Sequence, residues 1–119
     1  MNINKFTQKS IQAVQGCEKL AYDYGHQEIA QEHLLYSLLS DADGLIPKLF
    51  EKMEINVDVF LAQVTGLLNK RPKVQGGQVY ISNDLNKVLI YAENEAKAMG
   101  DEYVSVEHLF LSLLKNQSR

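Results

Sequence analysis

The sequence predicts an all-α protein in which one helical unit is written twice. Apolar residues recur at three- and four-residue steps through most of the chain. The stretch EHLLYSLLSD (32–41) returns as EHLFLSLLKN (107–116), and no segment shows the apolar–polar alternation of a half-buried strand. Because 119 residues suffice for one modest core, we expect both copies to share a single domain over residues 1–119.

A shift of 75 residues without a gap aligns residues 6–41 with residues 81–116. Nine of these 36 pairs are identical. Composition alone would give about two identities, so the chain contains an internal duplication. The identical pairs are Glu18/Glu93, Ala21/Ala96, Gly25/Gly100, Glu32/Glu107, His33/His108, Leu34/Leu109, Ser37/Ser112, Leu38/Leu113 and Leu39/Leu114.

The first helix of each copy is predicted from a cap, a buried stripe and a terminal glycine. Thr7 and Ser82 are N-cap residue types, and Gly25 and Gly100 stand where a left-handed C-cap residue is needed. Small and apolar residues between them recur with helical spacing and predict one buried face. That face comprises Ser10, Ala13, Val14, Cys17, Ala21 and Tyr24, matched by Leu85, Val88, Leu89, Ala92, Ala96 and Met99.

The second helix of each copy follows a short extended link, Glu28-Ile29 or Tyr103-Val104. Ser105 is expected to cap its helix, whereas Ala30 at the matching position has no side-chain acceptor. The Glu-His pair opening each helix places a carboxylate at the positive end of the helix dipole, and each histidine is expected to hydrogen-bond the preceding turn. Four apolar residues are expected inside in each copy, namely Leu34, Leu35, Leu38 and Leu39, and Leu109, Phe110, Leu113 and Leu114.

Two further helices are predicted between the copies. Asp43 is expected to cap one that runs to about Met53, and Asn56 to cap one that Pro72 ends. The second of these carries helical spacing at Val57, Phe60, Leu61, Val64, Leu67 and Leu68. We therefore divide the chain into repeat one (6–71), a Gly-rich linker (72–80) and repeat two (81–116). A complete second repeat would need two more helices, so we expect repeat two to be truncated in this chain.

Composition excludes several classes of protein. A net charge of −3 without a basic stripe does not suggest nucleic-acid binding, and the cluster Lys70, Arg71 and Lys73 is expected to complement a helix dipole. A single cysteine excludes an internal disulfide and fits a reducing compartment. The apolar runs are too short for a membrane helix, and MNINKFTQKS lacks the apolar core of a signal peptide. The expectation is a cytoplasmic, soluble protein that does not bind membranes.

No catalytic, metal or cofactor constellation is expected in this segment. His33 and His108 lack the H-E-x-x-H spacing of a zinc site, and no Walker loop for ATP is present. His26 is expected to be a solvated loop residue, and Cys17 a small core residue rather than a nucleophile. Gly76-Gly77-Gln78 resembles the tip with which peptide release factors hydrolyse peptidyl-tRNA, but paired glycines here are more typical of a flexible linker.

The duplicated unit resembles the N-terminal repeat domain of the Clp AAA+ ATPases. The matching residues are Phe6-Thr7, Ala21, Gly25-His26, EHLLYSLL and ISNDLNKVL–YAENEAKAMGDEYVSVEHLFLSLL, which together span essentially the whole chain. KRPKVQGGQVYIS resembles the joint of the disaggregases in this family more than that of the protease partners. The resemblance implies a non-enzymatic module on a hexameric ring that binds ATP and Mg²⁺ elsewhere in the parent protein, with the isolated domain monomeric.

The resemblance also implies where partners bind. Family members use a polar pair that matches Thr7 and Glu107, and an apolar groove near the junction of the repeats. The leucines that often line this groove are replaced here by Tyr91 and Glu95 on the first helix of repeat two. Leu20, Ile90 and Tyr91 lie outside the buried stripes, where they could form a patch for exposed apolar segments. The expected partners are unfolded or aggregated polypeptides; the alternative is an adaptor protein docking on a Clp protease subunit.

Overall fold

The computed structural model describes residues 3–74 and 78–116, so Gly76 and Gly77 of the glycine-rich linker lie outside the described residues. The elements follow in the order η1 (Ile3–Lys5), α1 (Gln8–Tyr24), β1 (Glu28–Ile29), α2 (Gln31–Ser40), α3 (Leu45–Lys52), α4 (Val57–Asn69), β2 (Tyr80–Ile81), α5 (Asn83–Ala98) and α6 (Val106–Lys115). The all-α prediction is confirmed, with one two-stranded sheet of two residues per strand.

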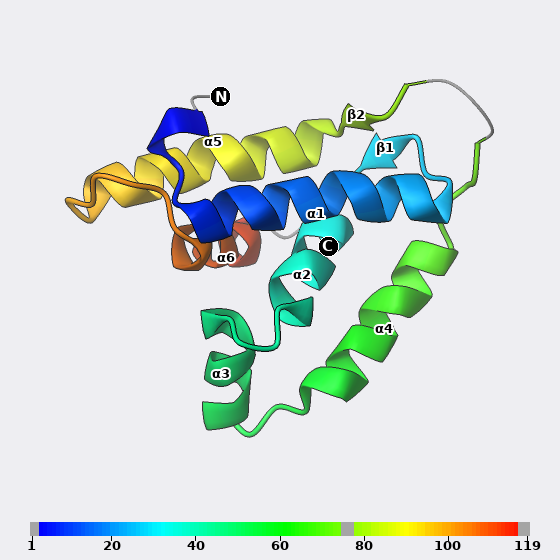
Figure 1. The fold of residues 1–119 in the computed structure, drawn as a ribbon, viewed down its shortest axis with the longest axis horizontal. Helices are drawn as coiled ribbons and strands as arrows, with labels where there is room; N and C mark the ends of the chain where they lie inside the picture. Colours follow the sequence, from blue (N-terminus) through cyan, green and yellow to red (C-terminus); the bar gives the residue numbers. More distant parts are fainter. Residues whose placement is uncertain (1–2, 75–77, 117–119) are drawn as a thin grey trace.

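The two copies form matching helix pairs (Figure 1). α1 packs on α2, α5 packs on α6, and the two pairs meet mainly where α2 and α1 contact α6. In Figure 1, α1 and α5 run in opposite directions above α2 and α6, while α3 and α4 extend below them. α4 packs on α2, so the inserted helices of repeat one cover the outer side of that helix.

The seam between the copies is built from reciprocal contacts. β1 pairs in parallel with β2, with Ile29 opposite Ile81, and a matching bridge joins Phe6 to Val104. Phe6 and Ile81 are equivalent under the 75-residue shift, as are Ile29 and Val104. Each copy thus lends its leading segment to the link of the other copy. This is the geometry of an isologous dimer with both halves on one chain.

Hydrogen bonds repeat with the same symmetry. The Thr7 N–H donates to the Val104 carbonyl at 2.9 Å, and the equivalent Ser82 N–H donates to the Ile29 carbonyl at 2.9 Å. Inside each helix pair, the Ser37 hydroxyl donates to the Ala13 carbonyl at 2.7 Å. Its counterpart from Ser112 reaches the Val88 carbonyl at 2.7 Å. One apolar core, which draws buried residues from both copies, lies around this seam.

The caps of the first helices are confirmed. Thr7 accepts a hydrogen bond from the Ser10 N–H at 3.2 Å, and Ser82 accepts one from the Leu85 N–H at 3.0 Å. Gly25 and Gly100 both have φ of 74°, which is the left-handed conformation that a residue with a Cβ adopts at a cost. Asn56 caps α4 as predicted, by accepting from the Val59 N–H at 3.0 Å.

Other local predictions are wrong. Asp43 does not cap α3; the N-cap is Gly44, whose N–H instead donates to the Asp41 carbonyl at 2.8 Å in a tight turn. Met99 and Leu114 were expected inside but are 55% and 51% exposed. Leu114 is equivalent to Leu39, which is 2% exposed on α2. The two differ because α4 packs on α2, whereas α6 has α3 beside it but no counterpart of α4 among residues 3–74 and 78–116.

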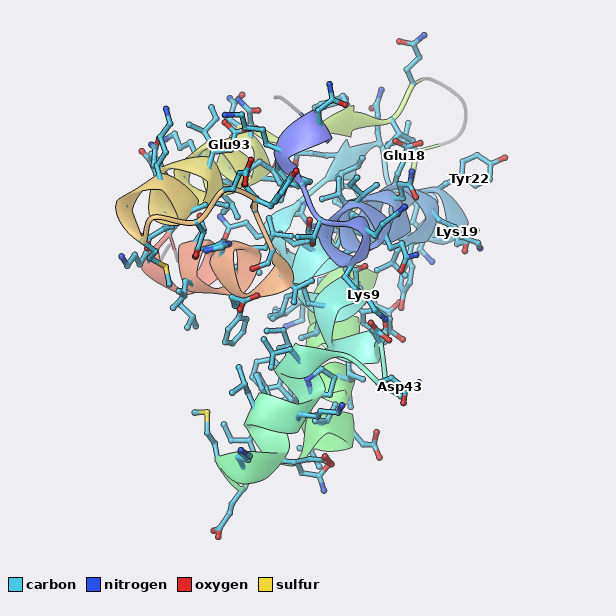
Figure 2. The ribbon with its side chains drawn as sticks, turned by 60° about the vertical axis from the view of Figure 1, so that its left-hand side comes forward. Lys9, Glu18, Lys19, Tyr22, Asp43 and Glu93 are labelled. Atoms are coloured by element: carbon cyan, nitrogen blue, oxygen red, sulfur yellow. The ribbon has the colours of Figure 1, made fainter. Side chains whose placement is uncertain are left out.

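The outer surface of α1 is polar and mixed in charge. Lys19 and Tyr22 project away from the body of the molecule (Figure 2), and Lys19 pairs with Asp23 one turn further along the helix at 2.8 Å. Tyr22 is 75% exposed and scattered apolar residues of this kind are ordinary on a protein surface. In the described part of the chain, no helix is long and apolar enough to cross a membrane.

Candidate functional site

The Glu-His signature is a helix cap built from a histidine. His33 Nδ1 accepts a hydrogen bond from the Ala30 N–H at 2.9 Å, and His108 Nδ1 accepts one from the Ser105 N–H at 2.9 Å. Each ring therefore reaches back from the third helical position to the N-cap backbone, as the glutamate of a capping box does. The expectation that these histidines bond the preceding turn is confirmed. The Ser105 hydroxyl does not bond the helix backbone as expected, because it donates to Glu107.

The second nitrogen of each histidine ties the helix start to the loop after the preceding helix. His33 Nε2 lies 2.9 Å from His26 Nδ1, and His108 Nε2 lies 2.8 Å from Asp101 Oδ2. His26 and Asp101 are equivalent positions that directly follow the left-handed glycines. The prediction of a solvated His26 is wrong, since its ring is 3% exposed. The hydrogen bond between the two rings holds this loop against the start of α2.

The His26–His33 pair is held neutral. Because His33 Nδ1 accepts from Ala30, its proton sits on Nε2 and donates to His26 Nδ1. Burial, the neighbouring His26 ring and the Arg71 guanidinium together lower the pKa of His33 to about 4. Burial and the charge of Arg71 also lower the pKa of His26. His26 Nε2 faces the Leu68 backbone but makes no hydrogen bond of ordinary geometry within the described residues.

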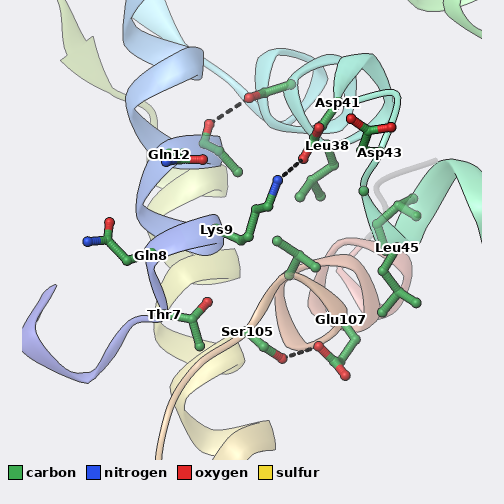
Figure 3. Close-up of a pocket in the computed structure, with 15 residues that line it drawn as sticks. Thr7, Gln8, Lys9, Gln12, Leu38, Asp41, Asp43, Leu45, Ser105 and Glu107 are labelled. Carbon is green, nitrogen blue, oxygen red and sulfur yellow. Dashed lines mark hydrogen bonds and ion pairs between the residues drawn. The ribbon is translucent and has the colours of Figure 1, made fainter.

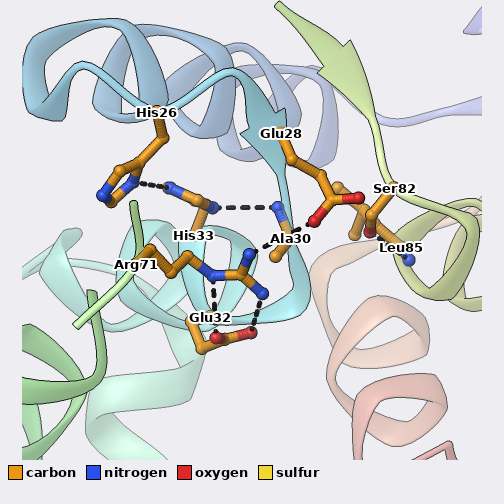
Figure 4. Close-up of polar contacts among 8 residues, drawn as sticks. All are labelled: His26, Glu28, Ala30, Glu32, His33, Arg71, Ser82 and Leu85. Atoms are coloured by element: carbon orange, nitrogen blue, oxygen red, sulfur yellow. Dashed lines mark hydrogen bonds and ion pairs between the residues drawn. The ribbon is translucent and has the colours of Figure 1, made fainter. Parts of the chain in front are cut away.

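The prediction that Arg71 complements the dipole at the end of α4 is wrong. Its guanidinium instead contacts two carboxylates of repeat one (Figure 4). Arg71 Nε lies 3.0 Å from Glu32 Oε2 and Nη2 lies 3.4 Å from Glu32 Oε1, while Nη1 lies 3.2 Å from Glu28 Oε1. The fork on Glu32 is the arrangement that makes arginine–carboxylate pairs specific. This contact joins the end of α4 to the start of α2.

A groove opens where the start of α1, the turn after α2 and the start of α6 meet (Figure 3). We call it the Thr7–Glu107 groove; its volume is about 530 Å³. Its apolar surface comes from Ala13, Leu38, Leu45, Ile46 and Val106. Its polar lining consists of Thr7, Gln8, Lys9, Gln12, Ser37, Asp41, Asp43, Gly44, Ser105 and Glu107. An apolar floor with a few polar groups is the usual composition of a binding site.

The rim of the groove carries a negative balance. Lys9 is its one cation, and Lys9 Nζ already lies 3.1 Å from Asp41 Oδ2. Asp43 and Glu107 remain without a cationic partner among the described residues. Within residues 3–74 and 78–116, Glu107 accepts only the hydroxyl of Ser105, which lies two residues before it. The groove therefore favours a ligand that brings apolar surface together with positive charge.

Of the residues predicted at the binding site, the structure brings Thr7 and Glu107 together. Both line the Thr7–Glu107 groove, although they do not hydrogen-bond one another: Thr7 Oγ1 bonds Ser10 and Glu107 bonds Ser105. The other predicted residues lie outside its lining. Ile90 and Tyr91 are 45% and 46% exposed on α5. Glu95 forms an ion pair with Lys115, and Leu20 is half-buried on α1.

Sequence reasoning missed the middle of the groove. Leu45, Ile46 and Asp41 belong to the turn after α2 and the start of α3, and nothing in their spacing relates them to the start of α1. Only the packing of α2 on α1 brings these segments together. A usable signal did exist for a second site, because the 75-residue shift that maps Thr7 to Ser82 also maps Glu107 to Glu32.

The described residues offer no obvious centre for catalysis or metal binding. Residues 3–74 and 78–116 contain no group of three or more histidine, cysteine or acidic side chains placed to hold a metal ion. Cys17 is 1% exposed, and burial raises the pKa of its thiol to about 12. A thiol in that state is unreactive.

Two helix pairs related by a pseudo-twofold axis, with a groove at one end of their seam, define a class of small helical domain built by duplication. Residues 5–119 match the model of the Clp repeat (R) N-terminal domain, and the chain belongs to that family. Within the family it resembles the N-terminal regions of ClpB chaperones.

Individual relatives and solved structures support the same family assignment. The chain is 42% identical to the chaperone protein ClpB of Nitratidesulfovibrio vulgaris over 120 residues, covering 97% of this chain and 14% of that protein. It thus spans about a seventh of that relative's length. The Hsp104 N-terminal domain from Candida albicans superposes with a TM-score of 0.88 at 22% identity, over 95% of this chain and 75% of that one. A ClpV N-domain in complex with a VipB peptide superposes with a TM-score of 0.78 at 21% identity, over 95% of this chain and 69% of that one.

Proposed function

We propose that this domain binds unfolded or aggregated polypeptide in the Thr7–Glu107 groove and assists its delivery to the AAA+ ring of a longer cytoplasmic Clp chaperone. The observation that carries this proposal is the groove itself, an apolar floor with an acidic rim at the junction of the two copies. Its size suits a short extended segment with one or two side chains inserted. The ring would supply ATP hydrolysis, and this segment would take no part in that chemistry.

The exposed apolar surface supports weak and sequence-tolerant binding. Leu45 is 41% exposed at the groove, next to the buried Leu38 and Ile46. Burying half of one leucine side chain yields only about 1 kcal/mol, so no single contact would fix the sequence of the segment. A chaperone that hands its substrate to a ring benefits from such modest affinity, because tight binding would oppose transfer.

Two relatives support the proposal that the domain binds polypeptide. A ClpV N-domain, which shares this fold, was solved with a VipB peptide bound. The similarity to ClpB chaperones supports an unfolded substrate rather than a small molecule. We extend the proposal to the architecture: a further helix pair would cover Leu114 on α6 as α3 and α4 cover α2, completing repeat two.

The test is a titration of a fluorescently labelled, permanently unfolded protein with the wild-type domain and with Leu45→Ser. We expect weak binding by the wild type. Leu45→Ser should weaken it about fivefold, because about 1 kcal/mol of apolar contact is lost. Thr7→Ala is a poorer probe, since the Thr7 side chain also caps α1.

Two matched variants locate the contact. Val59 is 57% exposed on α4 and lies outside the Thr7–Glu107 groove, so Val59→Ser should leave binding unchanged. Tyr91→Ser probes the outer face of α5, where the family resemblance indicates Tyr91 and Glu95. Ile90 on the same helix and Leu20 on α1 are the other predicted contact residues, which lie outside the buried stripes. A loss of binding in Tyr91→Ser with none in Leu45→Ser would contradict the groove and place the contact on α5.

The second candidate function is the docking of one adaptor protein. The ClpV complex favours it, because its ligand is a defined peptide of one partner. Docking predicts saturable binding of a single folded protein and no binding of the labelled unfolded chain. The titration described above separates the two functions directly.

A further inference from the structure

An ion pair spans the Thr7–Glu107 groove. Lys9 lies in the first turn of α1, Asp41 is the C-cap of α2, and Lys9 Nζ lies 3.1 Å from Asp41 Oδ2. In Figure 3 the Lys9 side chain reaches from α1 towards the turn after α2. Both residues line the groove. A polypeptide that enters here therefore meets a charged contact that the domain already makes with itself.

This ion pair is exposed and exchangeable. The Lys9 and Asp41 side chains are 58% and 43% exposed. Pairs of this kind contribute little free energy, because water solvates both charges and salt screens them. The Lys9 ammonium can thus leave the Asp41 carboxylate, and a cation from another chain can take its place. A buried pair would resist that exchange, since one charge would be left desolvated and unpaired.

The packing of the two helices does not need this ion pair. Under the 75-residue shift, Lys9 and Asp41 correspond to Asp84 and Asn116 in the second copy, where Asp84 and Glu32 line a second cavity. There Asn116 Nδ2 lies 3.4 Å from the Asp84 carbonyl oxygen, and an amide cannot form an ion pair. α5 nevertheless packs on α6 as α1 packs on α2. The Lys9–Asp41 contact is thus a feature of the groove and not of the duplicated helix pair.

The turn after α2 places the Asp41 carboxylate beside the apolar floor. The Gly44 N–H donates to the Asp41 carbonyl at 2.8 Å, and a Cβ on Gly44 would lie 3.0 Å from Asp41 Oδ2. The carboxylate therefore packs directly against Gly44, and Leu45 follows in the chain with 41% of its surface exposed. A ligand that contacts both Asp41 and Leu45 must carry a cation close to an apolar side chain.

We propose that Lys9 is a specificity-determining residue, which holds Asp41 in the free domain and yields it to a basic side chain of the bound polypeptide. The substrate is an extended segment in which a lysine or arginine stands next to a large apolar residue. The cation pairs with Asp41, and the apolar side chain packs on Leu38 and Leu45. Binding exchanges one exposed ion pair for another, so the basic residue gives selectivity while the affinity stays low. This inference rests on the proposed function and names the chemistry of its substrate.

The charges of the groove favour this exchange over the opposite one, in which an acidic side chain takes Lys9. Among the described residues of the lining, Asp41, Asp43 and Glu107 are anionic and Lys9 is cationic. An arriving cation meets a complementary field, whereas an arriving carboxylate is repelled. The groove should therefore distinguish basic from acidic segments of equal apolar character.

The first experiment compares two ten-residue glycine–serine peptides with blocked ends, which carry leucine–lysine–leucine or leucine–acetyl-lysine–leucine at the centre. Acetylation removes the charge and keeps the rest of the peptide. Amide chemical shifts of the ¹⁵N-labelled protein report both affinity and site. At low salt we expect the lysine peptide to bind about threefold more tightly and to shift the amides of Asp41, Gly44 and Leu45. The same peptide with glutamate in place of lysine should bind more weakly than the acetyl-lysine peptide.

The second experiment removes each member of the ion pair. Lys9→Met keeps the apolar stem without the competing charge, and should raise the affinity for the lysine peptide about threefold further while that for the acetyl-lysine peptide changes little. Asp41→Asn should remove the preference for lysine, and the double variant should behave as Asp41→Asn does. Lys19→Met is the matched control, because it breaks an exposed ion pair with Asp23 on the outer surface of α1 and changes the net charge equally. It should leave both affinities unchanged.

The outcomes distinguish this inference from the proposed function. Equal binding of the lysine and acetyl-lysine peptides by the wild type would overturn the basic substrate and leave polypeptide binding intact. An unchanged affinity of Lys9→Met for the lysine peptide, or an equal gain in Lys19→Met, would overturn the role of Lys9. A preference for lysine that persists in Asp41→Asn would overturn the assignment of Asp41. If no peptide shifts any amide of the groove, the proposed function fails together with this inference.

Discussion

His33 Nε2 lies 2.9 Å from His26 Nδ1, whereas at the equivalent place in the second copy His108 Nε2 lies 2.8 Å from Asp101 Oδ2. One duplicated histidine thus performs the same structural task with two different partners. A further proton on the His26–His33 pair would have to bind a buried nitrogen that already accepts a hydrogen bond, either His33 Nδ1 from the Ala30 N–H or His26 Nδ1 from His33. The first copy should therefore be sensitive to acid.

Acidification should destabilise the first copy. The pKa of His33 in the folded state is lowered from 6.5 to about 4, and that of His26 is lowered too, so the unfolded chain binds protons more readily. The stabilising contribution is complete above about pH 6.5 and is lost as the pH falls towards the folded value. Between pH 7.5 and 5.0 we expect the free energy of unfolding to fall by roughly 2 kcal/mol, measured by urea denaturation.

The chain offers its own control for this titration. His26→Asp reproduces the partner that His108 has in the second copy, and should reduce the loss of stability on acidification. Arg71, Lys73 and Glu32 also face the pair and remain unchanged in this variant. Tyr22→Ser alters an exposed side chain and should keep the wild-type dependence. An unaltered pH profile in His26→Asp would show that the pair is not the sensor.

Equivalent leucines should differ in their effect on stability. Leu39 is 2% exposed and Leu114 is 51% exposed, although they occupy equivalent positions near the ends of α2 and α6. Leu39→Ala should cost about 2–4 kcal/mol, because it removes buried methyl groups and leaves a cavity. Leu114→Ala should cost less than about 1 kcal/mol, and chemical denaturation of both variants provides the comparison. Similar costs would contradict the different packing of α2 and α6.

The two left-handed glycines should be equally intolerant of a side chain. A Cβ at Gly100 would meet nothing within 4 Å, and one at Gly25 would meet only the Lys73 side chain at 3.8 Å, so the penalty is conformational in both. Gly25→Ala and Gly100→Ala should each lower the free energy of unfolding by about 1 kcal/mol. Gly66, inside α4 with open space around it, is the matched control: Gly66→Ala should stabilise the domain by about 0.5–1 kcal/mol.

Cys17 should be inert in the native state. Its side chain is 1% exposed, and burial raises its pKa to about 12, so little thiolate forms at neutral or mildly alkaline pH. Alkylation by iodoacetamide near pH 8 should be at least about a hundredfold slower in the folded domain than in concentrated urea. Mass spectrometry of timed aliquots measures both rates, and comparable rates would contradict the buried position.

Much of the fold could be read from the sequence because its signals are local. N-cap residue types, terminal glycines and apolar spacing located α1, α2, α5 and α6, and the 75-residue shift revealed their duplication. The failures arose where a neighbour decides the outcome. His26 looks like a loop residue until His33 packs on it, and Leu114 looks like Leu39 until the coverage of their two helices is compared. The pairing of Thr7 with Glu107 in one groove came from a family resemblance and not from spacing.

The sequence by itself determined the helices, most of their boundaries and the existence of two equivalent halves, because caps and periodicity act within a few residues. Only the tertiary structure decided that Phe6 pairs with Val104 while Ile29 pairs with Ile81, so that each half completes the other. It alone placed the turn after α2 beside the start of α6, forming the Thr7–Glu107 groove, and directed the Arg71 side chain onto Glu32. Those contacts join residues tens of positions apart, and their selection depends on packing the whole core at once.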